Sequence, residues 1–362
     1  MNALKTLLLG GAMLAAPAMF ALVNGERWYD TDGAQINAHG GGVIFLDGRY
    51  WWYGEHRPGK KGETQLGVTC YSSPDLQNWT FEGVVLPLVE NDPMGVEPGC
   101  IIERPKVVYN PNTKQFVMWF HHELKGKGYA AAHAGVAVAD NPKGPFKMVR
   151  SARVNPDVLP ANLEEPTVIP QVTEGMEWWT PKWYEDVNNG LFVYRDLPGG
   201  QMSRDMTVFV DDDGKAYHIY SSEENLTLQI AELNEDYTDH TGKYIRIFPG
   251  GHNEAPAIFK KDGEYWMIAS GCTGWDPNEA RLMHAKDIMG EWTRLPNPCK
   301  GENADKTFLG QSTYILPVEG KGYVAIFDRW KPESLADSRY LWIPITFSED
   351  GTPEVVWTDE FK

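Results

Sequence analysis

The stretch Asp47-Gly48-Arg49-Tyr50-Trp51-Trp52-Tyr53 decides the fold class of this chain, because a turn dipeptide leads directly into a strand of aromatic residues. Comparable turn-then-aromatic stretches return at irregular spacing along the chain: Thr113–Trp119, Asp213–Tyr220, Asp262–Met267 and Gly320–Ile326. A unit of this kind that repeats at spacings of roughly fifty residues or more is typical of a radial all-β array. The sequence therefore predicts a five-bladed β-propeller, in which the inner strand of every blade contributes to one central pocket.

The composition agrees with a single all-β domain. The chain has 362 residues with 14 Trp, 16 Tyr and 14 Phe, and 42% of its residues are hydrophobic, which excludes an intrinsically disordered protein. The 36 Gly and 25 Pro suit many short strands joined by turns. No linker rich in Pro, Gly or Ser divides the chain, and closed all-β folds of this length are commonly one domain. We therefore expect residues 22–362 to form one domain.

The formal net charge of −17 is unfavourable for a nucleic-acid partner, because binding a phosphate backbone needs a basic stripe and the sequence has none. Beyond the N-terminal segment, no apolar stretch is long enough to cross a bilayer. The sequence implies no obligate protein partner. We expect neither a nucleic-acid partner nor a membrane span.

The N-terminal segment has the pattern of a signal peptide. Lys5 precedes an apolar run from Thr6 to Phe20, and Ala16-Pro17-Ala18 offers a small-residue cleavage site, with a second candidate at Ala21. The sequence therefore predicts removal of residues 1–21 and a soluble mature protein that is periplasmic or secreted.

The four cysteines have two possible states in such an oxidising compartment. Local disulfides could join Cys70 to Cys100 and Cys272 to Cys299, while buried free thiols are the alternative. No Cys-x-x-Cys pair and no paired His/Cys spacing resembles a structural zinc site.

Two other patterns suggest metal binding but have simpler interpretations. The Asp211–Gly214 run lacks the downstream Glu of a calcium-binding loop and reads as a hairpin turn. His39 and the His121-His122 pair could bind a metal or line the pocket, or they could be ordinary hydrogen-bonding residues. We predict no metal site.

Between residues 154 and 203 the repeat pattern breaks into a stretch rich in Pro, Glu and Trp, which includes the run Glu177–Tyr184. A loop this long inside a compact fold usually carries function or is poorly ordered. Exposed Trp side chains would suit stacking on sugar rings, although Trp more often packs in a core. We treat residues 154–203 as an insertion.

Eight short motifs carry a family resemblance when they are taken together in their order from about residue 27 to the C-terminus. They are His39–Gly42, Tyr53–Glu55, Glu103–Val107, Ser203–Met206, Tyr220–Asn225, Asn253–Pro256, Ser270–Trp275 and Gln311–Tyr314. Their order resembles glycoside hydrolase family 43, and more narrowly its branch of exo-β-1,3-galactanases and related galactosidases. The resemblance implies a five-bladed propeller that cleaves glycosidic bonds with inversion.

Inversion needs a protonated carboxylic acid at the leaving oxygen and a base that activates water across the ring, about 6.5 to 9.5 Å away. Glu254 matches the general acid of the family. The apolar strand Ala257-Ile258-Phe259 that follows suggests partial desolvation, which would raise the pKa of the acid. The alternative is a surface carboxylate in a turn.

Asp205 matches the third carboxylate of the family, which orients the acid and modulates its pKa. We expect it at the inner mouth of blade three, facing Glu254 on blade four, where two carboxylates would share protons. Its alternative role is a salt bridge to Arg204 or a turn cap.

The base is where this sequence departs from the wider family, whose blade-one Asp stands where Asn37-Ala38-His39 lies here. In the galactanase branch a glutamine is thought to replace it through an imidic tautomer, and Gln311 matches that glutamine. A neutral amide is a poor proton acceptor, so this role needs support from surrounding hydrogen bonds. Positioning water or a sugar hydroxyl is the milder role.

Glu103 matches a glutamate of the branch that contacts the hydroxyls of the terminal sugar, and it could also be the base. Carboxylates accept hydrogen bonds from paired hydroxyls, which helps to distinguish galactose from its epimers. Further candidate sugar contacts, each against a role in hydrogen bonding at a blade edge, are His39, Glu55, Glu223, Asn225 and Thr273. The inner strands of five successive blades would thus present His39, Glu103, Asp205, Glu254 and Gln311.

The sequence therefore predicts an exported, exo-acting, inverting glycoside hydrolase that releases terminal β-linked galactose from galactan or arabinogalactan side chains. Its partner would be an oligo- or polysaccharide substrate, and the chemistry requires no cofactor. One alternative is an α-L-arabinofuranosidase or β-D-galactofuranosidase on the same scaffold. The alternative from another class is a non-catalytic sugar-binding propeller, favoured by the missing blade-one Asp and disfavoured by the presence of Glu254 and Asp205.

Overall fold

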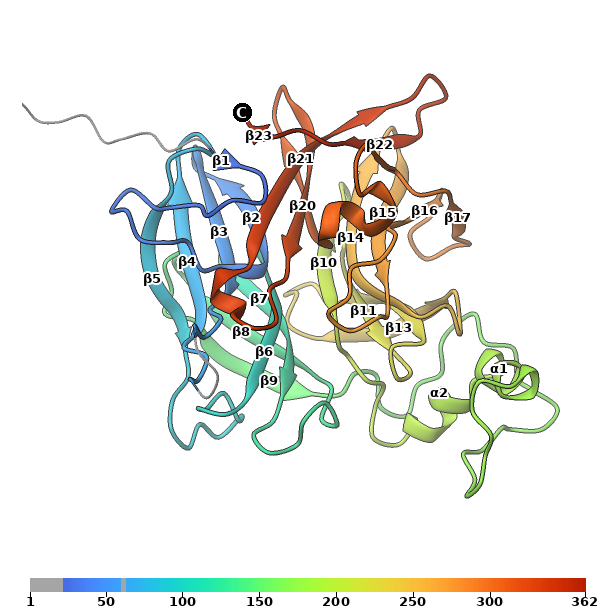
Figure 1. The fold of residues 1–362 in the computed structure, drawn as a ribbon. Helices are drawn as coiled ribbons and strands as arrows, with labels where there is room; N and C mark the ends of the chain where they lie inside the picture. The colour runs from blue at the N-terminus through green and yellow to red at the C-terminus, as the bar shows by residue number, and fades with distance from the viewer. Residues whose placement is uncertain (1–21, 60–62) are drawn as a thin grey trace, which may run out of the picture.

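The computed structural model describes residues 22–59 and 63–362. Within these residues, five antiparallel sheets are arranged around a central axis, so the prediction of a five-bladed β-propeller is confirmed (Figure 1). The signal-peptide prediction concerns residues 1–21 and lies outside the described residues.

In the first four blades the strands follow one another in chain order from the inside outward. Blade one contains β2 (His39–Leu46), β3 (Arg49–Glu55), β4 (Gly67–Ser73) and β5 (Thr80–Pro87). Blade two contains β6 (Ile101–Asn110), β7 (Gln115–Glu123), β8 (His133–Ala139) and β9 (Lys147–Ala152). Blade three contains β10 (Met206–Val210), β11 (Ala216–Ser222), β12 (Thr227–Leu233) and β13 (His240–Ile247). Blade four contains β14 (Asn253–Lys261), β15 (Glu264–Gly271), β16 (Arg281–Ala285) and β17 (Thr293–Leu295).

Blade five differs at its outer edge. It contains β19 (Gln311–Val318), β20 (Gly322–Arg329), β21 (Arg339–Phe347), β22 (Pro353–Val356) and the short parallel strand β18 (Cys299–Lys300). Strand β22 pairs antiparallel with β21. Between the ends of the described chain, β1 (Leu22–Val23) pairs with β23 (Glu360–Phe361). The short helices η1 (Ala304–Leu309) and η2 (Leu335–Asp337) belong to loops of this blade.

The five aromatic stretches that predicted the fold are the second strands of the five blades, β3, β7, β11, β15 and β20. Their large side chains fill the spaces between neighbouring blades, where each interface has its own apolar cluster. Between blades one and five, Trp28, Trp52, Trp79 and Trp342 pack with ring centroids 5.1 to 6.3 Å apart. The core is therefore distributed around the ring, which leaves the axis free for polar residues.

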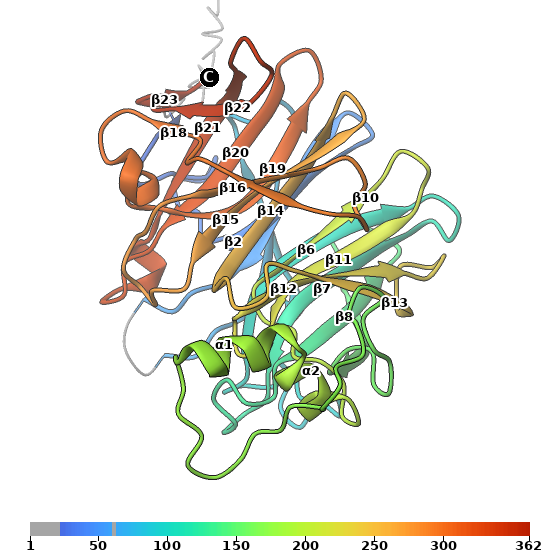
Figure 2. The same ribbon diagram turned by 90° about the vertical axis from the view of Figure 1, so that its right-hand side faces the viewer.

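The insertion carries α1 (Pro181–Asn188) and α2 (Leu191–Asp196), which lie beside the propeller at blade three (Figure 2). Helix α1 begins where the Thr180 side chain accepts a hydrogen bond from the Trp183 backbone N–H, and Pro181 suits the first turn. Both helices bury apolar side chains against Leu226, which follows β11. In the described part of the chain, no helix is long and apolar enough to span a membrane.

The fold tests two predictions of local structure, the turn at residues 211–214 and the state of the cysteines. Residues 211–214 form the turn between β10 and β11, as predicted. All four cysteines lie in the described part of the chain and are free, so neither local disulfide is present. Cys70, Cys100 and Cys299 are buried, whereas Cys272 is exposed and its thiol faces Glu254.

Candidate active site

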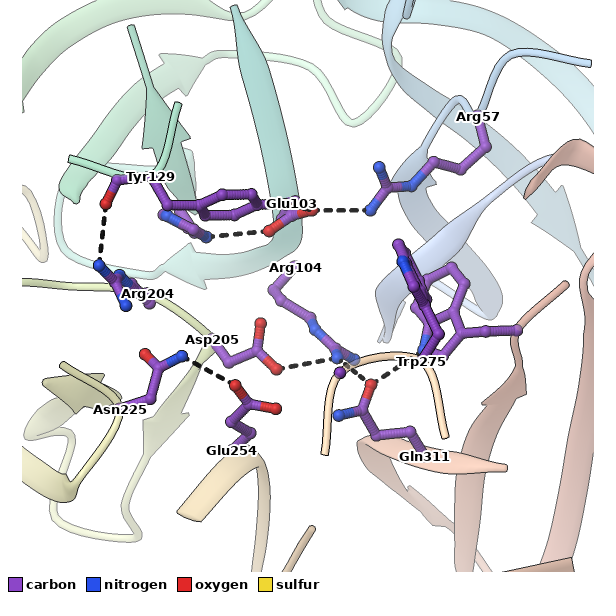
Figure 3. Close-up of a pocket in the computed structure, with 13 residues that line it drawn as sticks. Arg57, Glu103, Arg104, Tyr129, Arg204, Asp205, Asn225, Glu254, Trp275 and Gln311 are labelled. Atoms are coloured by element: carbon purple, nitrogen blue, oxygen red, sulfur yellow. Dashed lines mark hydrogen bonds and ion pairs between the residues drawn. The ribbon is translucent and has the colours of Figure 1, made fainter. Parts of the chain in front are cut away.

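A pocket of about 420 Å³ opens at the end of the propeller where the inner strands begin. Figure 3 shows side chains from all five blades converging on this space. Its lining consists of Arg57, Glu103, Arg104, His121, Tyr129, Arg204, Asp205, Asn225, Glu254, Gly274, Trp275, Gln311 and Trp330. Four candidates predicted from the sequence to line inner strands, Glu103, Asp205, Glu254 and Gln311, therefore meet in one pocket.

Backbone bulges place two of these carboxylates. The register of β6 shifts after Glu103 and that of β14 shifts after Glu254, and the next residues, Arg104 and Ala255, have left-handed φ angles of 55° and 53°. A bulge bends a strand and redirects its side chains, which is a common feature beside binding sites. Blade one has the same bulge after His39, with Gly40 at φ 58°.

Glu254 is partly buried and its carboxyl is held from one side by two donors. Oε1 accepts from Asn225 Nδ2 at 2.8 Å and faces the Cys272 thiol sulfur at 3.1 Å. Burial, together with the nearby negative charge of Asp205, raises the pKa of Glu254 to about 7. Glu254 can therefore carry a proton near neutral pH, as a general acid must.

Arg104 connects the carboxylate of blade three to the amide of blade five (Figure 3). Its Nη2 lies 2.9 Å from Asp205 Oδ2 and 2.5 Å from Gln311 Oε1. The predicted alternative for Asp205, a salt bridge to Arg204, is not formed, because Arg204 instead contacts Glu224 and the backbone carbonyl of Tyr129. The cation that orients Asp205 comes from blade two.

A buried lysine holds Arg104 in its left-handed conformation. The Lys106 ammonium donates to the backbone carbonyls of Gly40 at 2.7 Å and Arg104 at 3.3 Å, so it links the bulges of blades one and two. Burial, aided by the charge of Arg104, lowers the pKa of Lys106 to about 7.

The side-chain amide of Gln311 has a fixed orientation. Oε1 accepts from both Arg104 and Trp330 Nε1, the latter at 2.9 Å, and Nε2 donates to Ser270 Oγ at 3.0 Å. Arg104 and Trp330 are donors only, so the oxygen that faces them must be an acceptor. This arrangement favours the ordinary amide over an imidic tautomer, whose oxygen would carry a proton.

Three donors surround the carboxyl of Glu103. Its Oε1 accepts from Arg57 and from the Tyr129 hydroxyl, each at 3.0 Å, and its Oε2 lies 3.1 Å from His121 Nδ1. Burial would raise the pKa of Glu103, but the hydrogen bond from His121 and the charge of Arg57 hold it well below its usual range. Glu103 therefore remains a carboxylate that accepts hydrogen bonds and is a weak proton acceptor.

His121 reinforces this charge state. Its other nitrogen, Nε2, lies 2.8 Å from the buried Glu123. Burial disfavours the charged imidazole, but hydrogen bonds to Glu103 and Glu123 outweigh it and raise the pKa of His121 to about 9. His122 points elsewhere, to Ser151 Oγ and the backbone carbonyl of Gly95.

One wall of the pocket is aromatic. The guanidinium carbons of Arg57 and Arg104 lie 5.5 and 5.6 Å from the Trp330 ring, and Trp275 meets the same ring edge to face at 5.8 Å. No site role was predicted from the sequence for Trp330, Arg57 or Tyr129. Trp275 and Arg104 belong to the quoted motifs, whereas Trp330 follows a second strand and has no motif around it.

Of the five further candidate sugar contacts, Asn225 lines the pocket, whereas His39, Glu55, Glu223 and Thr273 do not. His39 is fully buried, 3.3 Å from Asp328, and stacks on Tyr340 at 4.8 Å. Glu55 is also fully buried and pairs with Arg57 at 2.7 Å, and burial raises its pKa to about 8 despite that partner. Glu55 thus contacts a residue that lines the pocket, Arg57, without lining it itself.

Glu223 and Thr273 have structural contacts of their own. Glu223 is fully buried and binds Arg246 through both oxygens, at 2.7 and 2.6 Å. Thr273 lies in the loop after β15, where its hydroxyl donates to the Asp276 carbonyl at 2.6 Å. Neither Glu223 nor Thr273 is among the residues that line the pocket.

Glu103, His121 and Asp205 form a set of possible metal ligands within the described residues, since one ligand atom of each lies within 4.8 Å of the others. The carboxylates of this set already face Arg57, Arg104 and the charged His121. Positive groups at these positions oppose a cation, so the geometry suits a sugar pocket better than a metal centre.

Comparisons with known proteins agree with the geometry. The model of the family described as glycosyl hydrolases family 43 matches residues 183–353. A family 43 β-1,3-galactosidase solved with galactodeoxynojirimycin is 59% identical, with a TM-score of 0.88 over 94% of this chain and 99% of that chain. An exo-β-1,3-galactanase from Clostridium thermocellum is 37% identical, with a TM-score of 0.76 over 94% of this chain and 66% of that one.

A curated relative matches a shorter region. It is a β-D-galactofuranosidase from Aspergillus niger, 28% identical over 172 residues, which are 46% of this chain and 49% of the relative. This match therefore spans about half the length of that protein. The galactosidase, by contrast, is covered almost completely at high identity, with the same fold. The chain belongs to glycoside hydrolase family 43.

Proposed function

We propose that the protein is an exo-acting, inverting glycoside hydrolase that releases terminal β-linked galactose from galactan or arabinogalactan side chains. The observation that carries this proposal is the carboxyl of Glu254, whose pKa is raised to about 7 beside Asp205 in a pocket of about 420 Å³. A protonated acid at the wall of a small pocket suits the protonation of a glycosidic oxygen.

In the proposed reaction Glu254 donates its proton to the leaving oxygen as the bond from the anomeric carbon to that oxygen breaks. A water molecule adds to the opposite face of the sugar, which inverts the configuration, and the proton that this water loses passes to solvent, from which Glu254 is protonated again. Asp205 contacts Arg104, and its negative charge beside Glu254 favours a proton on Glu254 before the reaction. Gln311, fixed as an amide by three partners, orients the water or a sugar hydroxyl.

Exo action is supported by the size and lining of the pocket. Its volume lies in the lower part of the range for small-molecule sites, which is about 300 to 1,000 Å³. The aromatic wall of Trp275 and Trp330 closes one side. We propose that one terminal sugar enters, with Glu103 and Asn225 among the groups that bind its hydroxyls.

Galactose is the proposed sugar because the relatives that cover most of this chain are described as β-1,3-galactosidases and exo-β-1,3-galactanases. A β-D-galactofuranosidase is the second candidate, supported by the curated relative. Both substrates end in galactose, but its ring has six members in a galactopyranoside and five in a galactofuranoside. The two rings would therefore need different contacts in the same pocket.

The experiment that tests the proposal is a comparison of purified protein on aryl β-D-galactopyranoside, aryl β-D-galactofuranoside, aryl α-L-arabinofuranoside and β-1,3-galactan. We expect galactose release from the first and last substrates. Proton NMR at early times should show α-galactose as the first product. Faster hydrolysis of a furanoside would favour the second candidate, and sugar binding without turnover on all four would favour a non-catalytic propeller.

We also propose that the protein is exported. The support is the sequence of residues 1–21. Cell fractionation with N-terminal sequencing of the mature protein tests this proposal, and recovery of the uncleaved chain in the cytoplasm would contradict it.

A further inference from the structure

The loop before α1 exposes two large aromatic rings. Trp178 is 41% exposed and Trp179 is 59% exposed, although most large apolar side chains in this fold are buried. Both rings rest on Trp183, which is 1% exposed and lies 5.4 Å from Trp178 and 4.8 Å from Trp179 between ring centroids. We call Trp178 and Trp179 the aromatic platform.

The conformation of Trp179 also needs an explanation. Its φ angle is 68°, in the left-handed region that a bulky residue rarely adopts. Strained residues of this kind persist when the surrounding structure enforces them, and they are concentrated at functional sites. Trp179 keeps this conformation although the residue is 59% exposed and is not enclosed in a core.

The insertion that carries the platform is fixed firmly to blade three. Arg246 in β13 donates to the backbone carbonyls of Val187 at 2.7 Å and Asn188 at 2.9 Å, at the end of α1. The same guanidinium is held by both oxygens of Glu223. Leu226 packs into the apolar core of the two helices. The platform is therefore preorganised, as a binding surface should be.

The platform contacts the segment that leads into Glu254. The Trp179 ring lies 5.4 Å from that of His252, and Nε2 of His252 lies 3.2 Å from the Tyr184 hydroxyl of α1. His252 is two residues before Glu254, which limits the separation of their Cα atoms to about 7.6 Å. From the other direction, Asn225, which binds Glu254, is the residue before Leu226.

The position of the platform near Glu254 indicates which part of a substrate would lie on it. A general acid protonates the leaving oxygen, so the leaving part of the substrate must run past Glu254. Sugar rings have faces of C–H groups that pack on the electron-rich faces of aromatic rings while their hydroxyls remain in water. A net charge of −17 opposes an acidic polymer and leaves a neutral one as the better occupant.

We propose that Trp178 and Trp179 bind the sugar units of a neutral galactan chain on the leaving-group side of the bond that is cut. This inference rests on the proposed function, because it takes Glu254 as the acid. The platform holds the polymer while the pocket holds only its terminal sugar. It therefore contributes to the hydrolysis of long substrates and not to that of aryl glycosides.

The experiment compares the wild type with the variants W178A, W179A and W178A/W179A. The matched control is F81A, since Phe81 is an exposed aromatic residue, 43% accessible, on the outer strand of blade one. For the double variant we expect kcat/KM on β-1,3-galactan oligosaccharides of four or more units to fall about tenfold, the loss expected for two stacking contacts. Its kcat/KM on aryl β-galactoside and all values for F81A should stay within twofold of the wild type.

Affinity electrophoresis in gels that contain β-1,3-galactan provides a second readout that needs no turnover. We expect the double variant to lose most of its retardation, while F81A keeps it. An equal loss on oligosaccharide and aryl substrates, or unchanged oligosaccharide kinetics and retardation, would overturn the proposal. A wild-type dimer that the double variant converts to a monomer would also overturn it, because a second copy would then cover the platform.

The two proposals can fail separately. If the wild type hydrolyses neither substrate, the proposed function is wrong, and galactan retardation still reports on the platform. If the wild type hydrolyses both substrates and the double variant behaves like it, only the platform proposal is wrong.

Discussion

The thiol sulfur of Cys272 lies 3.1 Å from the carboxyl oxygen Oε1 of Glu254. A hydrogen bond to a carboxylate stabilises its charged form, so this contact opposes the burial and the Asp205 charge that raise the pKa of Glu254. The value of about 7 is thus a balance that single substitutions can shift in either direction.

Replacing Cys272 with Ala should raise the pKa of Glu254 further. The acid must be protonated to act, so activity is lost as pH rises through this pKa, and the alkaline limb of kcat/KM should move to higher pH. A hydrogen bond of this strength corresponds to roughly half a pH unit. The measurement is the pH profile of kcat/KM for the wild type, C272A and C272S. The Ser variant keeps a donor and should stay close to the wild type, and an acidic shift for C272A would contradict the assignment.

Replacing Asp205 with Asn should shift the alkaline limb of kcat/KM to lower pH. Without the negative charge beside it, the charged form of Glu254 costs less, and its pKa falls. The alkaline limb of D205N should therefore lie below that of the wild type, and kcat at neutral pH should drop. We expect the alkaline limb of kcat/KM to lie at the highest pH in C272A, at an intermediate pH in the wild type and at the lowest pH in D205N. A limb that is the same in all three would show that another group governs it.

Glu254→Gln should reduce kcat by roughly 10² to 10⁴ on galactan oligosaccharides, the range for loss of a general acid. An aryl galactoside whose phenol is strongly acidic needs little protonation as it leaves, so its hydrolysis should fall much less. The ratio of the two losses in steady-state kinetics tests the role of Glu254 directly. Equal losses on both substrates would indicate that Glu254 binds the sugar and does not protonate the leaving group.

The sequence predicted the fold well because its signal is local. Each second strand combines a turn with aromatic residues that must be buried between blades, and this pattern is visible without knowledge of distant contacts. The resemblance to the family supplied Glu103, Asp205, Glu254 and Gln311, and the propeller pattern predicted their convergence, since the inner strand of every blade begins at one end of the axis.

The errors came from contacts between segments that are distant in the sequence. Glu223 follows a strand in a motif, as a sugar contact would, but Arg246 in another strand holds it inside blade three. His39 begins an inner strand, yet Asp328 and Tyr340 of blade five enclose it. Trp330 lacks a local pattern altogether, and only its packing against Arg57 and Arg104 places it at the pocket.

Glu223 is buried and Glu224 is partly exposed, so their substitution should affect the free energy of unfolding to different extents. Glu223→Gln leaves the buried Arg246 without a countercharge and should reduce the free energy of unfolding by about 3 kcal/mol. Glu224→Gln affects a side chain that is 30% exposed and should cost at most about 1 kcal/mol. Urea denaturation measures both. If Glu223 contacted sugar instead, its variant would raise KM and leave stability unchanged.

A substitution of Arg104 tests whether this residue positions Asp205 and Gln311 in the pocket. Its guanidinium contacts Asp205 and Gln311 from one nitrogen and the backbone carbonyl of Ser312 from the other, and a lysine ammonium is a compact point charge that cannot reproduce this fork. Arg104→Lys keeps the positive charge near Glu254 but releases the side chains of Asp205 and Gln311. We expect kcat to fall by about 10² with a smaller change in KM, since small misplacements of positioned groups cost rates of that order.

The matched control for Arg104 is Arg204→Lys. Arg204 also lines the pocket, but its partners are Glu224 and the Tyr129 carbonyl, so neither Asp205 nor Gln311 should move. We expect R204K to retain kcat within a fewfold of the wild type. If the two variants lost kcat equally, the link from Asp205 to Gln311 would have no special role, because R204K leaves that link intact. If R104K alone lost kcat and kept its fold by circular dichroism, the link between blades three and five would be what positions the reacting groups.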